Sequence, residues 1–300
     1  MTKEYILQIN GHDYSLGPRI WIMGVINITP DSFSDGGLYF DKDRALEKGL
    51  QLVEEGADII DIGGESTKPG SEAISPEEER RRVIPIITAL RKRTETLISI
   101  DTTKSEVAHA ALDAGADIIN DISALRFDPR MAPLAAQEEV PVILMHMKGT
   151  PKTMQVNPTY KDVLLEVKAF LEESIDKAQA SGIKKEKIII DPGIGFGKRL
   201  KDNLALINNL HILEELELPI LIGVSRKSFI GTILDSPPEE RLEGTIASAI
   251  LSVIHGAHIL RIHDVASVKK AVRVAEAIMR EDFSHPASRE CGEKKRDYAH

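Results

Sequence analysis

Several acidic and amide side chains stand at the ends of short aliphatic runs, where buried strands would carry them into the interior. Asp101, Asn120 and Asp191 are the clearest cases. A buried carboxylate without a partner is costly, so these groups need neighbours or ligands that donate hydrogen bonds. A carboxylate accepts two parallel N–H bonds from an amidine-like edge, and an amide offers one donor and one acceptor. Two acids and an asparagine can therefore bind a 2-amino-4-oxo heterocycle, with Lys227 meeting its carbonyl oxygen.

A second group of residues suits an anion. Arg261 and His263 are separated by one residue, so their side chains point the same way in a pleated strand. Phosphate sites in β/α barrels commonly follow the last two strands, which makes a phosphate site the natural interpretation. Asn27 offers one oxygen, which suits Mg²⁺ because this ion prefers water and substrate phosphates plus one or two protein ligands. An unperturbed imidazole titrates at about 6.5, which predicts that His263 affects activity near neutral pH.

Three other features are interpreted structurally. In the glycine-rich segment 193–198 the glycines alternate instead of following G-x-G-x-x-G, and no acidic ribose-binding residue is evident downstream, which argues against dinucleotide binding. Asp264 directly precedes the last predicted helix and is expected to cap it. Ser75 and Pro76 begin another helix, and the acidic run 77–79 is expected to be a solvated face at the positive end of its dipole.

These residues need a scaffold that brings strand ends together. Short aliphatic runs alternate with longer amphipathic segments, and each run is apolar at consecutive positions, as in parallel strands covered on both faces. Strands are expected at residues 20–28, 59–62, 97–100, 118–119, 140–145, 188–190, 220–224 and 259–262. Helices are expected at residues 43–55, 76–92, 105–114, 160–180, 202–213, 238–254 and 266–279. The pattern predicts an α/β fold, an eight-stranded parallel β/α (TIM) barrel, with its active site in the loops after the strands.

Residues 1–283 are expected to form one domain, since a β/α barrel of about 250 residues is a routine single unit. Strand formers flank Asn10 and Gly11, which predicts a short N-terminal β-hairpin within residues 1–17. Residues 284–300 show no periodicity and are expected to be a disordered polar tail.

Composition and charge exclude several functions. Hydrophobic residues make up 42% and charged residues 28% of the 300 residues, as in soluble globular proteins. A net charge of −9 would repel a polyanion, and no basic stripe compensates, so nucleic acid is not an expected partner. No apolar run reaches the roughly 18 residues that a membrane span needs, and no export signal is recognised. The single cysteine, Cys291, excludes internal disulfides and suits the cytoplasm.

Six segments in a fixed order resemble those of the dihydropteroate synthase family, and the resemblance extends from about residue 20 to residue 280. Any one segment would be modest evidence, but six in the family's order make coincidence implausible. They are residues 24–37 (Gly-Val-Ile-Asn-Ile-Thr-Pro-Asp-Ser-Phe-Ser-Asp-Gly-Gly), 61–70 (Asp-Ile-Gly-Gly-Glu-Ser-Thr-Lys-Pro-Gly), 100–102 (Ile-Asp-Thr), 191–198 (Asp-Pro-Gly-Ile-Gly-Phe-Gly-Lys), 223–228 (Gly-Val-Ser-Arg-Lys-Ser) and 261–264 (Arg-Ile-His-Asp).

The resemblance implies a reaction of 6-hydroxymethyl-7,8-dihydropterin diphosphate with 4-aminobenzoate, which gives 7,8-dihydropteroate and pyrophosphate, with Mg²⁺ as cofactor and a homodimeric enzyme. The implied pterin-binding residues are Asp101, Asn120, Met145, Asp191, Lys227 and Arg261. The implied diphosphate-binding residues are Asn27, Arg261 and His263, with Asn27 as the metal ligand. The implied 4-aminobenzoate pocket contains Phe33, Thr67, Lys68, Pro69 and Ser225, and the implied catalytic residues are Asn27, Asp35, Lys227 and Arg261.

The implied mechanism begins with early loss of diphosphate, which leaves a pterin methylene cation. Asp35 on the first loop is the candidate to stabilise this cation after loop closure, although an aspartate before two glycines is also a common turn residue. One position departs from the family, which often has Arg where this chain has Lys68. Lysine keeps the charge but loses the bidentate fork, so a carboxylate-clamping role at this position is less secure.

Three alternatives remain open at this point. A methyltetrahydrofolate-binding methyltransferase would share the fold and the pterin site, but the chain has no corrinoid module and the diphosphate residues would be unexplained. A non-catalytic pterin-binding homologue predicts eroded active-site loops, yet the loops within segments 24–37 and 61–70 are both present. A Schiff-base aldolase would use Lys227 as its nucleophile and would be trapped by borohydride.

Overall fold

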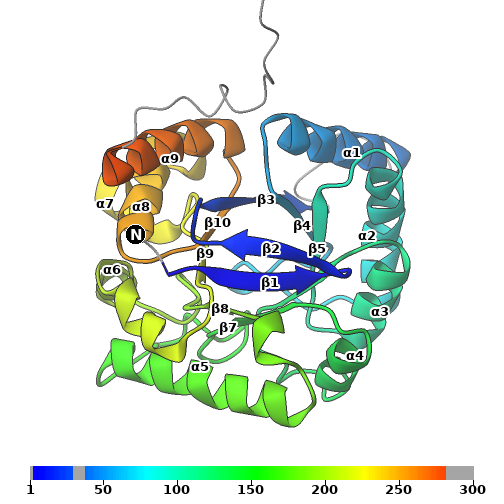
Figure 1. Ribbon diagram of the computed structural model, residues 1–300, viewed down its shortest axis with the longest axis horizontal. Coiled ribbons are helices and arrows are strands. Elements are labelled where there is room, and N and C mark those ends of the chain that lie inside the picture. Colours follow the sequence, from blue (N-terminus) through cyan, green and yellow to red (C-terminus); the bar gives the residue numbers. More distant parts are fainter. Residues whose placement is uncertain (1–2, 30–37, 282–300) are drawn as a thin grey trace, which may run out of the picture.

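The structure is a computed structural model that describes residues 3–29 and 38–281 (Figure 1). Eight parallel strands form one sheet in the order β8-β7-β6-β5-β4-β3-β10-β9. A parallel bridge from Ile190 in β8 to Ile220, just before β9, joins the two edges, so the sheet closes and the predicted barrel is confirmed. The strands are β3 (Trp21–Asn27), β4 (Ile59–Gly63), β5 (Leu97–Asp101), β6 (Ile118–Asp121), β7 (Val142–Met145), β8 (Ile188–Asp191), β9 (Leu221–Ile222) and β10 (Ile259–Ile262).

Helices form a ring outside the barrel (Figure 1). Their apolar sides pack on the outward-facing strand residues in one large cluster that includes Ile60, Ile98 and Leu144. In the part of the chain that the structure describes, no helix has the length and hydropathy needed to cross a membrane. The helices are α1 (Leu38–Glu54), α2 (Pro76–Arg91), α3 (Ser105–Asp113), α4 (Met131–Gln137), α5 (Val163–Ala180), α6 (Leu200–Asn208), α7 (Ser228–Leu234), α8 (Leu242–Ile254) and α9 (Val265–Arg280).

The helices differ from the prediction at several ends. The expected helix 202–213 is divided, because α6 ends at Asn208 and a 3₁₀ helix, η3 (Leu210–Leu216), follows. The expected helix 238–254 is also divided, into a 3₁₀ turn η4 (Pro238–Glu240) and α8. The short helices α4 and α7 were not predicted, because seven residues give less than two turns and so little periodicity.

A hairpin closes the amino end of the barrel. Its strands are β1 (Tyr5–Ile9) and β2 (His12–Leu16), and Figure 1 shows them lying across the ring of strands. Asn10 and Gly11 have φ angles of 50° and 77°, as a tight hairpin turn requires, so the predicted hairpin is confirmed. Apolar hairpin side chains pack with the inward-facing strand residues in one buried cluster: Leu7, Ile9, Leu16, Trp21, Met23, Ile59, Leu97, Ile118, Ile143, Ile189, Leu221 and Ile259. This end of the barrel is therefore filled.

The start of α2 confirms one prediction and corrects another. Ser75 Oγ accepts a hydrogen bond from the Glu78 N–H at 3.2 Å, and Pro76 occupies the first turn, as predicted. Glu79, however, is only 1% exposed. The interpretation of the whole run 77–79 as a solvated face is wrong for this residue, since its side chain points inward to a cation described below.

Candidate active site

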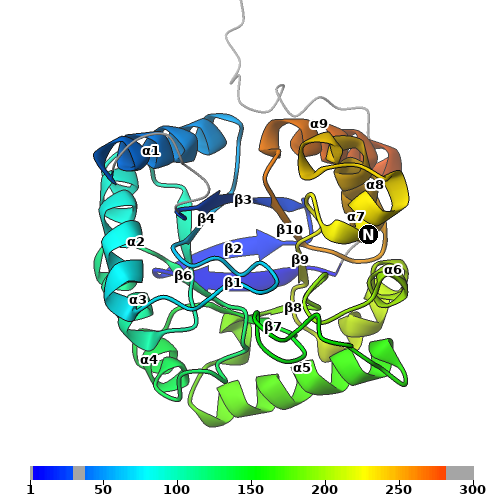
Figure 2. The same cartoon turned by 180° about the vertical axis from the view of Figure 1, so that it is seen from behind.

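Residues from six strand ends meet in one pocket at the carboxyl end of the barrel. Figure 2 shows the barrel from this end, opposite the hairpin. The pocket includes every residue predicted to bind a pterin, together with Thr67 from the loop after β4. Ile122, Ile194 and Phe196 add apolar walls that the sequence did not single out. The geometry therefore brings the predicted ring-binding residues together, and their roles in binding remain predictions. The predicted residues in the pocket are Asp101, Asn120, Met145, Asp191, Lys227 and Arg261.

Arg261 lies at the centre of a buried ionic network. Its Nε donates to Asp61 Oδ2 and its Nη2 donates to Asp101 Oδ2, both at 2.7 Å. The Asn120 amide donates to the same Asp61 carboxylate at 3.2 and 3.3 Å. Asp61 is fully buried and was missed as a site residue, although a charged residue inside the aliphatic run of β4 could have identified it. Its carboxylate fixes the positions of two side chains predicted to meet the ligand.

The electrostatics of the pocket favour a ligand that donates hydrogen bonds. Burial raises the pKa of Asp101, although the Arg261 guanidinium opposes the shift, and burial also raises the pKa of Asp191. Burial and the nearby Arg261 lower the pKa of Lys227 to about 8. Two carboxylates, Asp101 and Asp191, and two cations, Lys227 and Arg261, line the pocket, while Asp61 beneath it accepts from Arg261 and Asn120. The two carboxylates suit the N–H groups of an amino-oxo heterocycle.

The glycine-rich loop after β8 is built for close packing. Gly193 and Gly197 have positive φ angles, and a Cβ there would lie 2.0 Å from His146 O and 2.5 Å from Lys148 O. Lys198 turns inward, where its Nζ lies 2.8 Å from His146 Nδ1 and from Gly193 O. The buried Lys198 side chain therefore holds the loop against the end of β7. The two glycines allow the backbone of the loop to lie close to the backbone of residues 146 and 148. Phe196, carried by this loop, places its ring centroid 4.4 Å from Lys227 Nζ.

His263 and Ser225 form a pair at the ends of β10 and β9. Ser225 Oγ lies 3.0 Å from His263 Nδ1 and accepts a hydrogen bond from the His263 N–H at 3.2 Å. Asp264 does not cap α9 with its side chain, so that prediction is wrong. Its carboxylate instead accepts two hydrogen bonds from Arg226, at 2.5 and 2.9 Å. This ion pair fixes the loop that carries Ser225 and Lys227.

The pH dependence predicted for His263 changes in the structure. Burial, and then the cations Arg261, Arg226 and Lys227, lower the pKa of His263 to about 4. The imidazole is therefore neutral near pH 7, and the expectation that it titrates at about 6.5 is wrong.

We expect His263→Gln to leave the shape of the pH profile unchanged between about pH 6 and 7.5, since the imidazole is already neutral there. The measurement is kcat/KM for the pterin diphosphate across this range, because this ratio reports ionisations of the free enzyme. A decline of the wild-type ratio toward acid pH that disappears in the variant would contradict the assignment.

The residues predicted to form the 4-aminobenzoate pocket are only partly gathered. Thr67 lines the pocket, whereas Lys68 and Pro69 are exposed at the tip of the same loop. Ser225 is buried against His263. Phe33 and the catalytic candidate Asp35 lie outside the described residues.

Asn27 meets the chemical requirement for a single magnesium ligand. It ends β3, is exposed, and pairs in register with Gly63, which in turn pairs with Asp101. A Cβ on Gly63 would lie 3.7 Å from both Asn27 Oδ1 and Asp101 Oδ2, which places these two oxygens on either side of the same strand position. Among the described residues no group of three or more His, Cys, Asp or Glu could hold a metal. The donor set therefore fits Mg²⁺ held largely by substrate phosphates and water.

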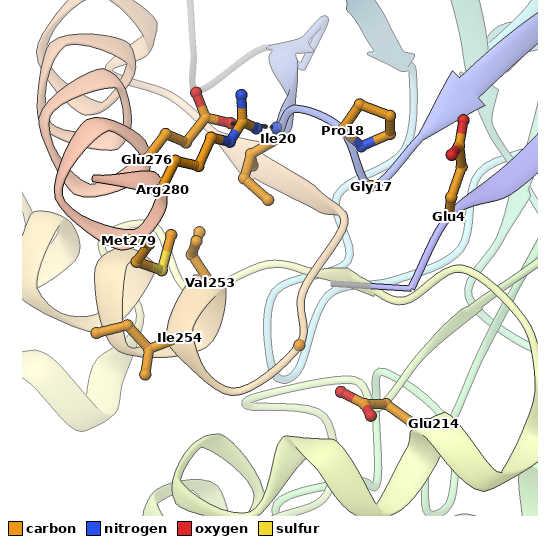
Figure 3. A pocket seen from close by; sticks show the side chains of 11 residues that line it. Glu4, Gly17, Pro18, Ile20, Glu214, Val253, Ile254, Glu276, Met279 and Arg280 are labelled. Carbon is orange, nitrogen blue, oxygen red and sulfur yellow. Dashed lines mark hydrogen bonds and ion pairs between the residues drawn. The ribbon is translucent and has the colours of Figure 1, made fainter. Parts of the chain in front are cut away.

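A separate hollow lies at the hairpin end of the barrel (Figure 3). Its walls include Glu4, Glu214, Glu276 and Arg280, and Glu276 accepts a hydrogen bond from the Ile20 N–H at 2.7 Å. Ile20 precedes β3, so this hollow faces the amino ends of the strands. Active sites of β/α barrels lie at the opposite end, and none of the predicted site residues lines this hollow.

The closed barrel and its ring-binding pocket define the chain as an enzyme of the pterin-binding β/α-barrel class. A family model described as pterin binding enzyme matches residues 23–263. Dihydropteroate synthase from Synechocystis sp. is 47% identical over 268 residues, which are 89% of this chain and 93% of that protein. The chain belongs to the dihydropteroate synthase family.

Solved structures of relatives agree with this assignment. A dihydropteroate synthase from Xanthomonas albilineans with 4-aminobenzoic acid superposes with a TM-score of 0.87 at 46% identity, covering 92% of this chain and 99% of that one. The same enzyme in complex with 7,8-dihydropteroate gives a TM-score of 0.80 at 45% identity, covering 88% and 96%. The predicted family is therefore confirmed.

Proposed function

We propose that the protein joins 6-hydroxymethyl-7,8-dihydropterin diphosphate to 4-aminobenzoate and releases 7,8-dihydropteroate and pyrophosphate. The bond between the pterin methylene carbon and the diphosphate oxygen breaks, the amine nitrogen bonds to that carbon, and the amine loses a proton. The observation that carries this proposal is the set of ring-edge acceptors, Asp101, Asn120 and Asp191, beside Lys227 and Arg261 in one pocket. The 4-aminobenzoic acid and 7,8-dihydropteroate bound by the Xanthomonas albilineans relative support these substrates here.

The pterin ring would be read along its edge and held on its face. Asp191 Oδ1 accepts from the Gly193 N–H at 2.7 Å, and we assign Oδ2 of the same carboxylate to the ring. Asp101 and Asn120 would complete the edge, and Lys227 would donate to the ring carbonyl. The two in-plane hydrogen bonds of Arg261 fix the orientation of its guanidinium, so its flat face is prepared to stack on the ring. Met145 provides apolar contact.

The diphosphate would lie between the ends of β3 and β10. His263 receives its Nδ1 hydrogen bond when the Ser225 hydroxyl donates, which places the proton of the neutral ring on Nε2 as a donor to phosphate. Arg261 would supply charge, and Asn27 would provide one oxygen ligand to Mg²⁺. The ion, when bound, neutralises charge on the departing diphosphate. The residues of the chain hold the leaving group in place while the methylene carbon becomes cationic.

The 4-aminobenzoate site would be completed by residues of two loops, which predicts ordered binding. Thr67, Lys68 and Pro69 belong to the loop after β4, and we assign Phe33 and Ser225 to the same site and Asp35 to stabilisation of the cation. Lys68 and Pro69 are exposed at the tip of their loop, and we infer that the first substrate completes the pocket.

We therefore expect labelled 4-aminobenzoate to bind at least about tenfold more tightly once pyrophosphate and a pterin are present. The first ligands order the loops, so the binding of 4-aminobenzoate costs less conformational entropy. Equilibrium dialysis with each combination of ligands measures this. Equal affinity for the empty enzyme would contradict ordered binding.

For assembly we propose a homodimer formed through α6, α7 and α8. Large apolar side chains are exposed on all three helices, which is the surface composition expected of an interface between copies. The exposed side chains are Leu200, Leu204, Ile233, Leu234, Leu251 and Ile254. A mass from light scattering equal to that of one chain would contradict the dimer.

We also propose that the enzyme is cytoplasmic, in keeping with its single cysteine.

The experiment that tests the function is a coupled assay of pyrophosphate release with the pterin diphosphate, run with and without 4-aminobenzoate. Release that depends on the amine, together with 7,8-dihydropteroate identified by mass, supports the proposal. Borohydride should trap no adduct on Lys227, and a trapped adduct would favour Schiff-base chemistry instead.

A further inference from the structure

Three charged side chains meet at the base of the loop after β4, outside the ring-binding pocket. Lys104 Nζ lies 2.5 Å from Glu65 Oε2 and 2.5 Å from Glu79 Oε2. The side chains of Lys104 and Glu65 are each 19% exposed, and that of Glu79 is 1% exposed. The three residues come from different parts of the barrel: the end of β4, helix α2 and the residue before α3. We call this group the Lys104 clamp.

Two members of the Lys104 clamp, Lys104 and Glu79, occupy positions that are unfavourable by themselves. Lys104 is the residue before α3, where the helix dipole disfavours a cation, and it makes no capping hydrogen bond. Glu79 is buried on the inner side of α2, where burial raises the pKa of its carboxyl. An isolated buried carboxylate is costly, and Lys104 offsets this cost by pairing with it. The local preferences of α2 and α3 therefore do not explain these residues.

The clamp controls how the loop leaves the barrel. Glu65 Oε2 also accepts a hydrogen bond from the Ile74 N–H at 2.9 Å, so one carboxylate ties the start of the loop to its end. Gly64 lets α2 come close, because a Cβ there would lie 2.8 Å from Val83 Cγ1 and 3.0 Å from Glu79 Cγ. Between the tied ends lies residue 67, which lines the pocket. Arg82 Nη1 also donates to Gly64 O at 2.9 Å, so the base of the loop is held by this hydrogen bond together with the ammonium group between the two glutamates.

The tip of the same loop is folded on itself. Ser71 Oγ donates to Ser66 O at 2.5 Å or to Lys68 O at 2.8 Å, and the Gly70 N–H donates to Pro151 O at 3.1 Å. The Ser71 bonds hold the tip in shape, and the Gly70 bond attaches it to the segment after β7. The loop is therefore held both at its tip and at its base.

We propose that Lys104 is a positioning residue, which through Glu65 and Glu79 holds the loop 65–74 where Thr67 and Lys68 can meet 4-aminobenzoate. The inference rests on the proposed function for the identity of that substrate. Under this proposal Lys104 shapes the 4-aminobenzoate pocket without contacting either substrate. The proposed pterin-binding residues Asp101, Asn120 and Asp191 line the pocket and lie outside the clamp, although the Glu79 charge is one of the causes that raise the pKa of Asp101.

The test replaces Lys104 with methionine in the full chain, since Lys104→Met keeps most of the aliphatic stem and removes the charge. Amide hydrogen exchange in residues 66–74 should become at least about tenfold faster, because the base of the loop opens. The KM for 4-aminobenzoate should rise by about tenfold while the Kd of a pterin analogue changes by less than about twofold. Lys177→Met, which removes an exposed ion pair with Glu173 on α5, is the matched control and should change neither quantity.

Glu79→Gln is the second variant, since it keeps the shape of the side chain and removes the charge that Lys104 meets. It should show the same pattern in weaker form and protects the test if Lys104→Met does not fold. Unchanged exchange in residues 66–74, or equal losses of affinity for both ligands, would overturn the proposal. The exchange measurement needs no turnover. Failure of the wild-type enzyme to form dihydropteroate would therefore overturn the proposed function alone.

Discussion

Replacing Arg261 with alanine should lower kcat/KM by about 10²–10³-fold, the size of effect seen when one donor to developing charge is removed. The guanidinium has two tasks in the proposed reaction, to stack on the pterin and to meet the departing diphosphate. The second interaction strengthens as the C–O bond breaks, so part of the loss should appear only in kcat. Steady-state kinetics with Mg²⁺ in excess, beside calorimetric titration with a pterin that lacks phosphates, separates the two contributions.

Arg261→Lys is the informative companion variant. It keeps the positive charge but lacks the flat guanidinium, whose Nε and Nη2 donate to Asp61 and Asp101 at 2.7 Å each. It should therefore recover part of the diphosphate interaction and little of the stacking. If Arg261→Ala raised only the KM for 4-aminobenzoate and left pyrophosphate binding intact, the anion site would have to be placed elsewhere in the barrel mouth.

Asp191→Ala and Asp101→Ala should each weaken binding of a pterin analogue by about 1–3 kcal/mol for each hydrogen-bond partner lost, because the donors of the ring would be buried without an acceptor. Calorimetric titration at neutral pH measures the loss. Asp191→Ala is the simpler of the two, since Asp101 also pairs with Arg261 and its removal disturbs that cation as well.

Asp61→Asn provides a comparison for these variants. Asp61 holds Arg261 and Asn120 but belongs to the network beneath the pocket, so its loss should reduce kcat together with affinity. Unchanged affinity for the pterin analogue in both Asp191→Ala and Asp101→Ala would contradict the proposal that these carboxylates bind the edge of the ring. The result for Asp61→Asn would not alter this conclusion.

The barrel could be predicted from the sequence because its strands are the aliphatic runs themselves. In a parallel sheet covered on both faces, such a run marks the strand and the next polar residues mark the active-site end. Asp101, Asn120 and Asp191 were therefore found together at one mouth, as residues at the ends of such runs. Arg261 could be assigned to the same end from the sequence, but its hydrogen bonds to Asp61 and Asp101 could not be predicted.

Buried charged side chains were the residues that sequence reasoning missed. Asp61 lies within an aliphatic strand, Glu79 within an acidic run at a helix start, and Lys198 at the end of a glycine loop. The local patterns around Glu79 and Lys198 have ordinary explanations. What gives the residue its role is a partner far along the chain, such as Lys104 for Glu79 or His146 for Lys198. No local periodicity encodes such pairs.

The pairing of β10 with β3 has a consequence for how the protein is made. Ile259 pairs with Trp21, and the ion pair between Arg261 and Asp61 joins residues 200 positions apart. Synthesis proceeds from the amino end, so β3 is made long before its partner β10. The ring of hydrogen bonds between the barrel strands can close only when β10 has been made. Until then β3 has an open edge, and Asp61 and Asp101 are without their cation. A nascent chain that ends before residue 259 should therefore neither bind pterin nor hide its strand edges, and chaperones would recognise it as unfinished.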